Sequence, residues 1–426
     1  MKRYLFDTVD TVLDNGIRLI TIKKETQLAA LNIGVKVGAI YEKKEERGIS
    51  HFIEHMLFKG TRTRDNEKLN SDLENLGGEY NAYTDYTSTV FNTTTLNEEL
   101  PMAIELLSDF IKNPSFNEED MEKERGVILA EIRSGKDDVE DLSFTMINNF
   151  AFNQSPLKVD VIGKESIVKT LSRDDLFSYY NRYYVPNNTI ISVVSSYEHE
   201  YVRELIESNF KDWKSKAIDE AILKFEKNKN AHKVTHRDNM EQSTVLYLYS
   251  FQDLSKKEEL ALRVLNHKFG ESSNSILFRE LRENQGLAYD VYTTLDLTNN
   301  LKTLYIYSAV SPDEVEGTIE TIDKCIENVK EEIIVFDEGT ISLMKKVFKT
   351  AVASTLEDSS DLGSYVVHQA MDGENIYQFN EDMRKLNEIE AKDLYDVARK
   401  VLVNPTIHVL LCHKDKYTGD DERVLH

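Results

Sequence analysis

Residues 51–61 read HFIEHMLFKGT and bring two histidines and a glutamate within five positions. On an α-helix each residue advances by about 100°, so His51, Glu54 and His55 fall on one face. Two imidazoles one turn apart can bind the same zinc ion, and a carboxylate beside them can take a proton from water bound to that ion. If the segment is helical, the spacing predicts half of a hydrolytic metal site.

The alternative is one turn of an ordinary half-buried helix. With ten histidines in 426 residues, composition alone produces His-x-x-Glu-His in about two such chains per hundred. The flanking residues are strongly apolar: Ile49, Phe52, Ile53, Met56, Leu57 and Phe58. Two histidines and a glutamate are costly to bury in such a helix without partners, and a metal would satisfy all three. The context therefore favours the metal site.

A third ligand has to come from elsewhere, because catalytic zinc sites commonly have three protein ligands and one open position. The segment 116–134, FNEEDMEKERGVILAEIRS, predicts a helix that follows Pro114. Glu124 and Glu131 lie seven residues apart, within about 20° of each other around that helix. One can bind the metal while the other supports it through hydrogen bonds. Two glutamates on a helix more often form a solvated face, but Glu131 interrupts the apolar run VILAEI.

The composition restricts the class of protein. A chain that is 40% hydrophobic and 30% charged fits a soluble globular protein. The net charge of −23 disfavours nucleic-acid binding, which needs clustered Lys and Arg. Cys325 and Cys412 are too few for a disulfide scaffold or a thiolate zinc site, and they fit a reducing compartment. Because the N-terminus lacks a signal-peptide core and no run of 18 apolar residues occurs, we expect a cytoplasmic protein without membrane spans.

The chain contains an internal repeat. ENLGGEYNAYT (74–84) matches ENQGLAYDVYT (283–293) at six of eleven positions without a gap, at an offset of 209 residues. PNNTIISVVSS (186–196) resembles VNPTIHVLLCH (403–413) at an offset of 217. Both offsets are close to half of the chain and the matches keep the same order, so we infer a duplication.

The duplication sets the predicted fold and its boundaries. Each half reads as an early strand, two helices, a glycine-containing turn, strands rich in Thr, Tyr and Val, and an amphipathic helix. This order predicts an α+β fold with two homologous domains, each an antiparallel-rich mixed sheet packed with helices. The polar, lysine-rich stretch 214–233 predicts a linker, so the domains are expected at 1–213 and 234–426.

Together these features resemble a known family, the pitrilysin/insulinase-type zinc peptidases, and in particular its mitochondrial-processing-peptidase-like branch with subunits of this length. The family's signature is His-x-x-Glu-His followed by a glutamate ligand 76 residues after the second histidine, and Glu131 lies 76 residues after His55. The blocks HFIEHMLFKGT and GGEYNAYTDYTSTVF also resemble the family's own. The resemblance covers essentially the whole chain.

The resemblance implies a role for each residue of the two helical segments. His51, His55 and Glu131 would hold zinc. Glu54 would activate water as the general base, and then act as the acid toward the leaving amine. Glu124 matches an additional acidic position of the family, next to the ligands.

The resemblance also implies a substrate-binding strand that contains Asn81, Ala82 and Tyr83. The edge of this strand would pair with an extended peptide, since main-chain hydrogen bonds recognise any peptide backbone and side-chain pockets add selectivity. For Tyr83, packing within the strand is an equally good interpretation.

The second half lacks the zinc motif. At the equivalent positions it has Ala261, Val264 and Leu265, so one zinc ion per chain is expected. LRENQGLAY instead places Arg282 and Tyr289 seven residues apart, which resembles the family's arginine–tyrosine pair near the scissile carbonyl. Both groups can donate hydrogen bonds to a developing oxyanion. Without the resemblance, they would be interpreted as a surface charge and a strand residue.

In this family two such subunits close like a clamshell around a chamber, and the partner subunit donates the arginine–tyrosine pair. This chain carries both the zinc motif and the pair, so we expect a homodimer that shares its active sites. The predicted function is a zinc endopeptidase that cleaves short or unfolded peptides, with no nucleic-acid or membrane partner. The alternative is a non-catalytic peptide-binding or structural subunit of a larger peptidase-like assembly.

Overall fold

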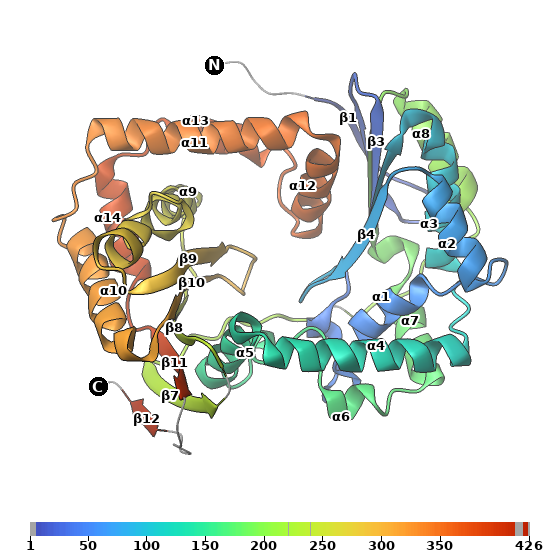
Figure 1. Ribbon diagram of the computed structural model, residues 1–426. Coiled ribbons are helices and arrows are strands. Elements are labelled where there is room, and N and C mark those ends of the chain that lie inside the picture. The colour runs from blue at the N-terminus through green and yellow to red at the C-terminus, as the bar shows by residue number, and fades with distance from the viewer. Residues whose placement is uncertain (1–5, 220, 239, 414–420, 425–426) are drawn as a thin grey trace. The chain divides into compact units, whose positions relative to one another are not determined.

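The computed structural model describes residues 6–219, 221–238, 240–413 and 421–424. The chain forms two compact units, each built around a six-stranded sheet (Figure 1). Unit 1 comprises Met1–Arg133, Asp160–Ile222 and Val352–Asn380, and unit 2 comprises Ser134–Val159, Leu223–Ala351 and Glu381–His426. Helices pack on both mixed sheets, so the predicted α+β class is confirmed.

The sheet of unit 1 has the order β1-β2-β6-β3-β5-β4. Its strands are β1 Asp7–Val12, β2 Arg18–Lys23, β3 Leu28–Val35, β4 Glu79–Thr84, β5 Thr89–Leu96 and β6 Thr189–Ser195. Among the described strands of this sheet, β2 and β6 run parallel and the other neighbours run antiparallel. β4, which carries the predicted substrate-binding residues, lies at the edge of the sheet.

Helices cover both faces of this sheet. The helices of unit 1 are α1 Ile49–Leu57, α2 Asn66–Asn75, α3 Leu100–Lys112, α6 Glu165–Val168, α7 Arg173–Tyr183, α8 His199–Phe210 and α12 Ser359–Met371, together with most of α4 Glu118–Asp137. Alternate residues of β6 enter different cores. Ile191 and Val193 pack with α1, α3, α7 and α8, whereas Ile190 and Val194 pack with α12. Since both faces of the sheet are covered, every residue of β6 is buried, and its apolar residues do not alternate with exposed polar ones.

The sheet of unit 2 has the order β12-β7-β11-β8-β10-β9. Its strands are β7 Ala231–Asp238, β8 Ser243–Ser250, β9 Ala288–Asp296, β10 Thr303–Val310, β11 Thr406–His413 and β12 Asp421–Val424. β7 and β11 run parallel, as β2 and β6 do, and β9 takes the edge position of β4. The two sheets therefore repeat one topology, as the inferred duplication requires. β1 and β12 fill equivalent outer positions although they come from opposite ends of the chain.

The remaining helices belong wholly or partly to unit 2: α5 Val139–Ala151, α9 Lys256–Asn266, α10 Val315–Lys330, α11 Glu338–Glu357, α13 Gln378–Leu386 and α14 Ala391–Val401. α5 comes from the first half of the sequence and packs on β8 and β11, whereas α12 comes from the second half and packs on β3 and β6. The two halves of the sequence thus exchange one helix each. No helix in the described ranges combines the length and the apolarity that crossing a bilayer requires.

Because of this exchange, the compact units do not coincide with the predicted domains. The division into 1–213, 214–233 and 234–426 follows the repeat, whereas the compact units interleave along the chain. In the predicted linker, residues 214–219 and 221–230 form neither helix nor strand, and β7 begins at Ala231. The outermost residues of both predicted domains, 1–5 and 425–426, lie outside the described residues.

Gly363 allows α12 to lie close to the sheet, and this gives a test of the packing. A Cβ at Gly363 would lie 2.4 Å from Asn32 Nδ2, and the Gly363 carbonyl accepts a hydrogen bond of 2.8 Å from Ser192 Oγ. We expect Gly363→Ala to lower the free energy of unfolding by about 1–3 kcal/mol, because α12 must shift away from β3. The change in the free energy of unfolding is measured by urea unfolding followed by circular dichroism.

Gly126→Ala is the matched control within the same unit. Gly126 lies on α4, and a Cβ added to it would have no atom within 4 Å outside its own helix backbone and its chain neighbours. Alanine there should raise the free energy of unfolding by up to about 1 kcal/mol. Equal stability of the two variants would show that Gly363 is not required for the close approach.

Candidate metal centre

The helix α1 buries one face and presents the other. Its buried residues are Ile49, Ser50, Phe52, Ile53, Met56 and Leu57. Hydrophobic burial therefore fixes the rotation of the helix, and the three polar residues of HFIEH fall on the remaining face. The histidines and Glu54 are partly buried there, so the site is shielded from solvent on one side but remains accessible.

The helix α4 provides the acidic residues. The Asn117 side chain accepts a hydrogen bond of 2.9 Å from the Glu119 amide at the start of the helix, and Met121, Ile128 and Ile132 are buried along one face. Glu124 lies in the same buried face, with 7% of its surface exposed. An acidic side chain in this position needs partners, and α1 supplies them.

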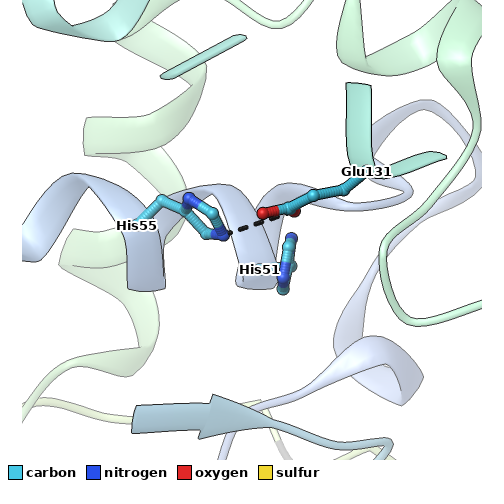
Figure 2. Close-up of side chains that lie close together, drawn as sticks. All are labelled: His51, His55 and Glu131. Carbon is cyan, nitrogen blue, oxygen red and sulfur yellow. Dashed lines mark ion pairs between the residues drawn. The ribbon is translucent and has the colours of Figure 1, made fainter. Parts of the chain in front are cut away.

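The structure brings His51, His55 and Glu131 together (Figure 2). One possible ligand atom from each residue lies within 4.8 Å of the others. The two imidazole rings have centroids 4.6 Å apart, and His55 Nε2 lies 3.6 Å from Glu131 Oε2. Two neighbouring residues of one helix and a third from a separate helix thus point toward a common centre.

Glu124 orients one of the histidines from the other side. His55 Nδ1 donates a hydrogen bond of 3.0 Å to Glu124 Oε2, and Lys59 Nζ lies 2.9 Å from Glu124 Oε1. Since the carboxylate can only accept, a neutral His55 carries its proton on Nδ1, and Nε2 faces Glu131. A carboxylate behind a histidine in this way fixes both the tautomer and the orientation of a metal-binding imidazole. Glu131, rather than Glu124, lies on the open side.

The surroundings shift the pKa values of these groups in opposite directions. Burial, with a smaller contribution from His55, lowers the pKa of His51 to about 4. Burial also acts to lower the pKa of His55, but the hydrogen bond to Glu124 and the charges of Glu131, Glu54 and Glu124 outweigh it and raise that pKa. His51 is therefore neutral, as a metal ligand must be, while His55 holds a proton more tightly than a free histidine.

Glu54 lies beside this centre and is held by a strand residue. The hydroxyl of Thr84, the last residue of β4, donates a hydrogen bond of 2.5 Å to Glu54 Oε2. Burial raises the pKa of Glu54, and the Thr84 hydrogen bond opposes this in part. The interaction links the carboxylate directly to the edge strand.

The residues present fit a zinc ion. Two imidazole nitrogens and one carboxylate oxygen form a donor set that zinc accepts, and three protein ligands leave a position open. In addition, His51 Nδ1 is buried and has no hydrogen-bond partner within the described residues. A buried polar atom without a partner is costly, and a metal ion bound through Nδ1 would supply the partner that is missing.

The predicted substrate-binding residues lie on the edge strand. In the described part of the chain, β4 pairs with β5 alone, which leaves its other edge open. The Asn81 side chain accepts a hydrogen bond of 2.9 Å from the Ala82 amide. Tyr83 packs on α12, where its hydroxyl lies 2.5 Å from His368 Nε2. The Tyr83 side chain therefore contacts a helix of unit 1, and the peptide-binding role of the strand stays a prediction.

Arg282 and Tyr289 belong to unit 2 and are both exposed. Arg282 lies in the π-helix Phe278–Asn284, with its guanidinium carbon 5.1 Å from the centre of the Phe278 ring. Tyr289 lies on β9 with 57% of its surface exposed, and its hydroxyl lies 2.9 Å from Ser311 Oγ. Arg282 has no ion-pair partner in the described residues, and the exposure of both side chains leaves them accessible to another molecule.

Two contacts of the site were not predicted from the sequence. Lys59 follows His55 by four residues, a spacing that could have indicated its place beside the site. For Thr84 no sequence pattern predicts the contact with Glu54, because that contact depends on how the strand lies against α1. At the equivalent positions of unit 2, Ala261, Val264 and Leu265 are buried in α9.

Comparison with known proteins identifies the family. The family model described as Insulinase (Peptidase family M16) matches residues 18–165, and the one described as Peptidase M16 inactive domain matches residues 170–338. The chain belongs to peptidase family M16. The first match contains His51, His55 and Glu131, and the second contains Ala261, Val264 and Leu265, which replace the zinc motif in the second half. The family predicted from the sequence is thereby confirmed.

Relatives of this M16 chain are named as zinc proteases. The "uncharacterized zinc protease YmxG" of Bacillus subtilis (strain 168) is 26% identical over 347 residues, which cover 81% of this chain and 84% of that protein. An "uncharacterized zinc protease" of Rickettsia bellii is 28% identical over 395 residues, which cover 91% and 93%. These names support a zinc protease.

Solved structures share the fold. A protease from Helicobacter pylori superposes with a TM-score of 0.90 at 23% identity, over 96% of this chain and 100% of that chain. A "peptidase M16 inactive domain" from Pseudomonas fluorescens superposes with a TM-score of 0.87 at 14% identity, over 97% and 99%. The two-unit architecture is therefore shared along the entire length of these chains.

The opposite shifts of the two histidines give a prediction for the metal-free chain. NMR titration of the imidazole protons should give a pKa of about 4 for His51 and a pKa above 6.5 for His55. Glu124→Gln should lower the pKa of His55, because it removes a charged acceptor. Since the pKa of His55 is raised on folding, its contribution to stability is present below the unfolded pKa and is lost as pH rises through the folded one.

Glu122→Gln is the control on the same helix. Glu122 is exposed and interacts with Arg125 rather than with the histidines. It should leave both imidazole pKa values unchanged. A His55 pKa that does not respond to Glu124→Gln would argue against the orienting role of Glu124.

Proposed function

We propose that this M16-family chain is a zinc-dependent endopeptidase that hydrolyses peptide bonds in short or unfolded peptides. The observation that carries the proposal is the convergence of His51, His55 and Glu131 within 4.8 Å, with the carboxylate of Glu54 beside them. We further propose that the chain works as a homodimer and that each active site takes residues from both subunits.

The zinc ion would be held by His51, His55 and Glu131, one ion per chain. When bound, it supplies the positive charge that lowers the pKa of water and polarises the scissile carbonyl. Glu124 keeps the Nδ1 proton of His55 in place, so that Nε2 stays available as a ligand atom. Lys59 in turn keeps Glu124 ionised, because the nearby ammonium helps to lower the pKa of that carboxyl.

Glu54 would carry the proton during hydrolysis. Its Oε2 accepts the Thr84 hydroxyl, which leaves Oε1 to take the proton of the attacking water and to deliver it to the leaving amine. A carboxyl whose pKa is raised by burial is suited to both steps, since it holds the proton better than an exposed glutamate does.

The peptide would lie along the open edge of β4. Because Thr84 ends this strand and holds Glu54, a peptide hydrogen-bonded to the edge would present its backbone next to the general base. Asn81, Ala82 and Tyr83 would contribute main-chain groups to this pairing. Recognition through the backbone would favour extended, unfolded substrates, because a folded protein does not offer a free strand.

Arg282 and Tyr289 would come from the partner subunit and donate hydrogen bonds to the oxyanion. Their exposure in unit 2 supports a contact outside the chain. A guanidinium and a phenol provide the donors that a tetrahedral intermediate needs.

The general-base role predicts the effect of Glu54→Gln. The amide cannot accept the proton, so kcat on an unstructured peptide should fall by at least about 100-fold while zinc content stays at one ion per chain. Metal analysis and peptide cleavage followed by mass spectrometry measure both. Glu67→Gln on α2 is the control and should leave both unchanged, because Glu67 is exposed at the start of that helix. Full zinc content without any Glu54-dependent cleavage of a diverse peptide pool would favour the peptide-binding subunit instead.

Sharing of the active site predicts complementation between inactive chains. A heterodimer of a Glu54→Gln chain and an Arg282→Ala chain contains one complete site if Arg282 acts across the dimer, and none if it acts within its own chain. With differently tagged chains and double affinity purification, such heterodimers should show about half of the wild-type activity per dimer. Activity no higher than that of the two parent homodimers would exclude sharing.

A further inference from the structure

The N-terminus of α1 has no capping side chain on the residue that precedes the helix. The residue before the helix is Gly48, which has no side chain and a φ of 95°. A Cβ at this position would lie 2.6 Å from the Ile162 carbonyl oxygen, so a capping Ser, Asp or Thr does not fit. The first amide groups of a helix have no intrahelical acceptors, and here they are buried.

Glu42 supplies the missing acceptors from outside the helix. Its Oε2 accepts a hydrogen bond of 2.9 Å from the Gly48 amide, and its Oε1 accepts one of 3.0 Å from the Ser50 amide. The Ser50 hydroxyl lies 2.9 Å from the hydroxyl of Tyr179 on α7. One carboxylate therefore binds two amide groups at the start of the helix, and Ser50 connects this helix end to the core.

This carboxylate is almost fully buried. Glu42 is 4% exposed, and within the described residues no cationic group lies in ion-pair contact with it. Burial raises its pKa to about 7, although the backbone hydrogen bonds and, more weakly, the charge of Arg47 act against this. A buried carboxylate is costly, and the positive end of the helix dipole helps to stabilise it here. Glutamine could not replace it fully, because an amide presents only one acceptor oxygen.

The position of this anchor matters for the metal centre. α1 is nine residues long, and His51 directly follows Ser50, whose amide Glu42 binds. In so short a helix, a shift or fraying of the first turn changes the direction of His51 and, one turn later, of Glu54 and His55. Metal ligands must keep their geometry within a few tenths of an ångström.

We propose that Glu42 is a positioning residue of the metal centre: its carboxylate fixes the first turn of α1 and thereby the directions of His51, Glu54 and His55. The effect on zinc affinity follows from the geometry of α1, and the effect on hydrolysis rests on the proposed peptidase function.

Glu42→Gln tests this proposal. The dissociation constant for Zn²⁺ is measured on the full chain by competition with a chelator, and we expect it to rise about tenfold. Amide hydrogen exchange should become faster in residues 49–55 and stay unchanged in β8. On a peptide substrate kcat should fall while KM stays within about twofold, because the β4 edge is untouched. Glu45→Gln is the matched control, since Glu45 lies three residues away and is exposed.

Each outcome decides the question. Zinc affinity and α1 exchange equal to those of Glu45→Gln would overturn the proposal. If Glu42→Gln fails to fold, Glu42→Asp, which keeps the charge but shortens the reach, is judged by the same two measurements. Failure of both variants to fold would overturn it in favour of a general role in folding. If zinc affinity falls but wild-type chain cleaves no peptide, the positioning role stands and the proposed peptidase function fails.

Discussion

The polar face of α1 is the constraint on which the site depends. Six of the nine residues of this helix are buried, so its rotation is fixed by apolar packing. The two histidines and the glutamate on the opposite face are too enclosed to be fully hydrated, and each therefore needs a partner. α4 and β4 supply these partners: Glu124 and Glu131 for the histidines, and Thr84 for Glu54. The packing of the apolar residues of α1 thus determines where the two histidines and Glu54 lie.

The electrostatics of the site follow from this enclosure. Burial lowers the pKa of His51 and raises the pKa of Glu54, and both shifts favour the neutral forms. Burial acts on Glu124 in the same way, but the hydrogen bonds to His55 and Lys59 outweigh it and lower the pKa of that carboxyl. Burial thus makes Glu54 a stronger proton acceptor than an exposed carboxylate, while Glu124 is held ionised and orients His55. Such a mixture of shifted pKa values in one cluster is typical of functional sites.

The duplication shows which features belong to the fold and which to the site. Both sheets have the same strand order, with one parallel pair and an edge strand at equivalent places. Only the first unit has the zinc motif, and in the second unit the equivalent residues Ala261, Val264 and Leu265 are buried in α9. Since an apolar helix can satisfy the same packing, the sheet architecture does not require the polar residues of α1. The presence of these polar residues in one unit therefore indicates a function rather than a need of the fold. Membership of a peptidase family is consistent with that conclusion.

The sequence by itself determined the local elements and the family. The helical spacing of His51, Glu54 and His55, the helix with Glu124 and Glu131, and the order of repeated strands could all be predicted, because periodicity and capping are properties of neighbouring residues. Only the tertiary structure decided the rest. It placed Glu131 on the open side and Glu124 behind His55, and it showed that the two halves of the sequence exchange α5 and α12. It also revealed Glu42 and Thr84, whose partners lie six to thirty residues away. Such contacts depend on how buried elements pack against each other, and no local pattern in the sequence encodes that geometry.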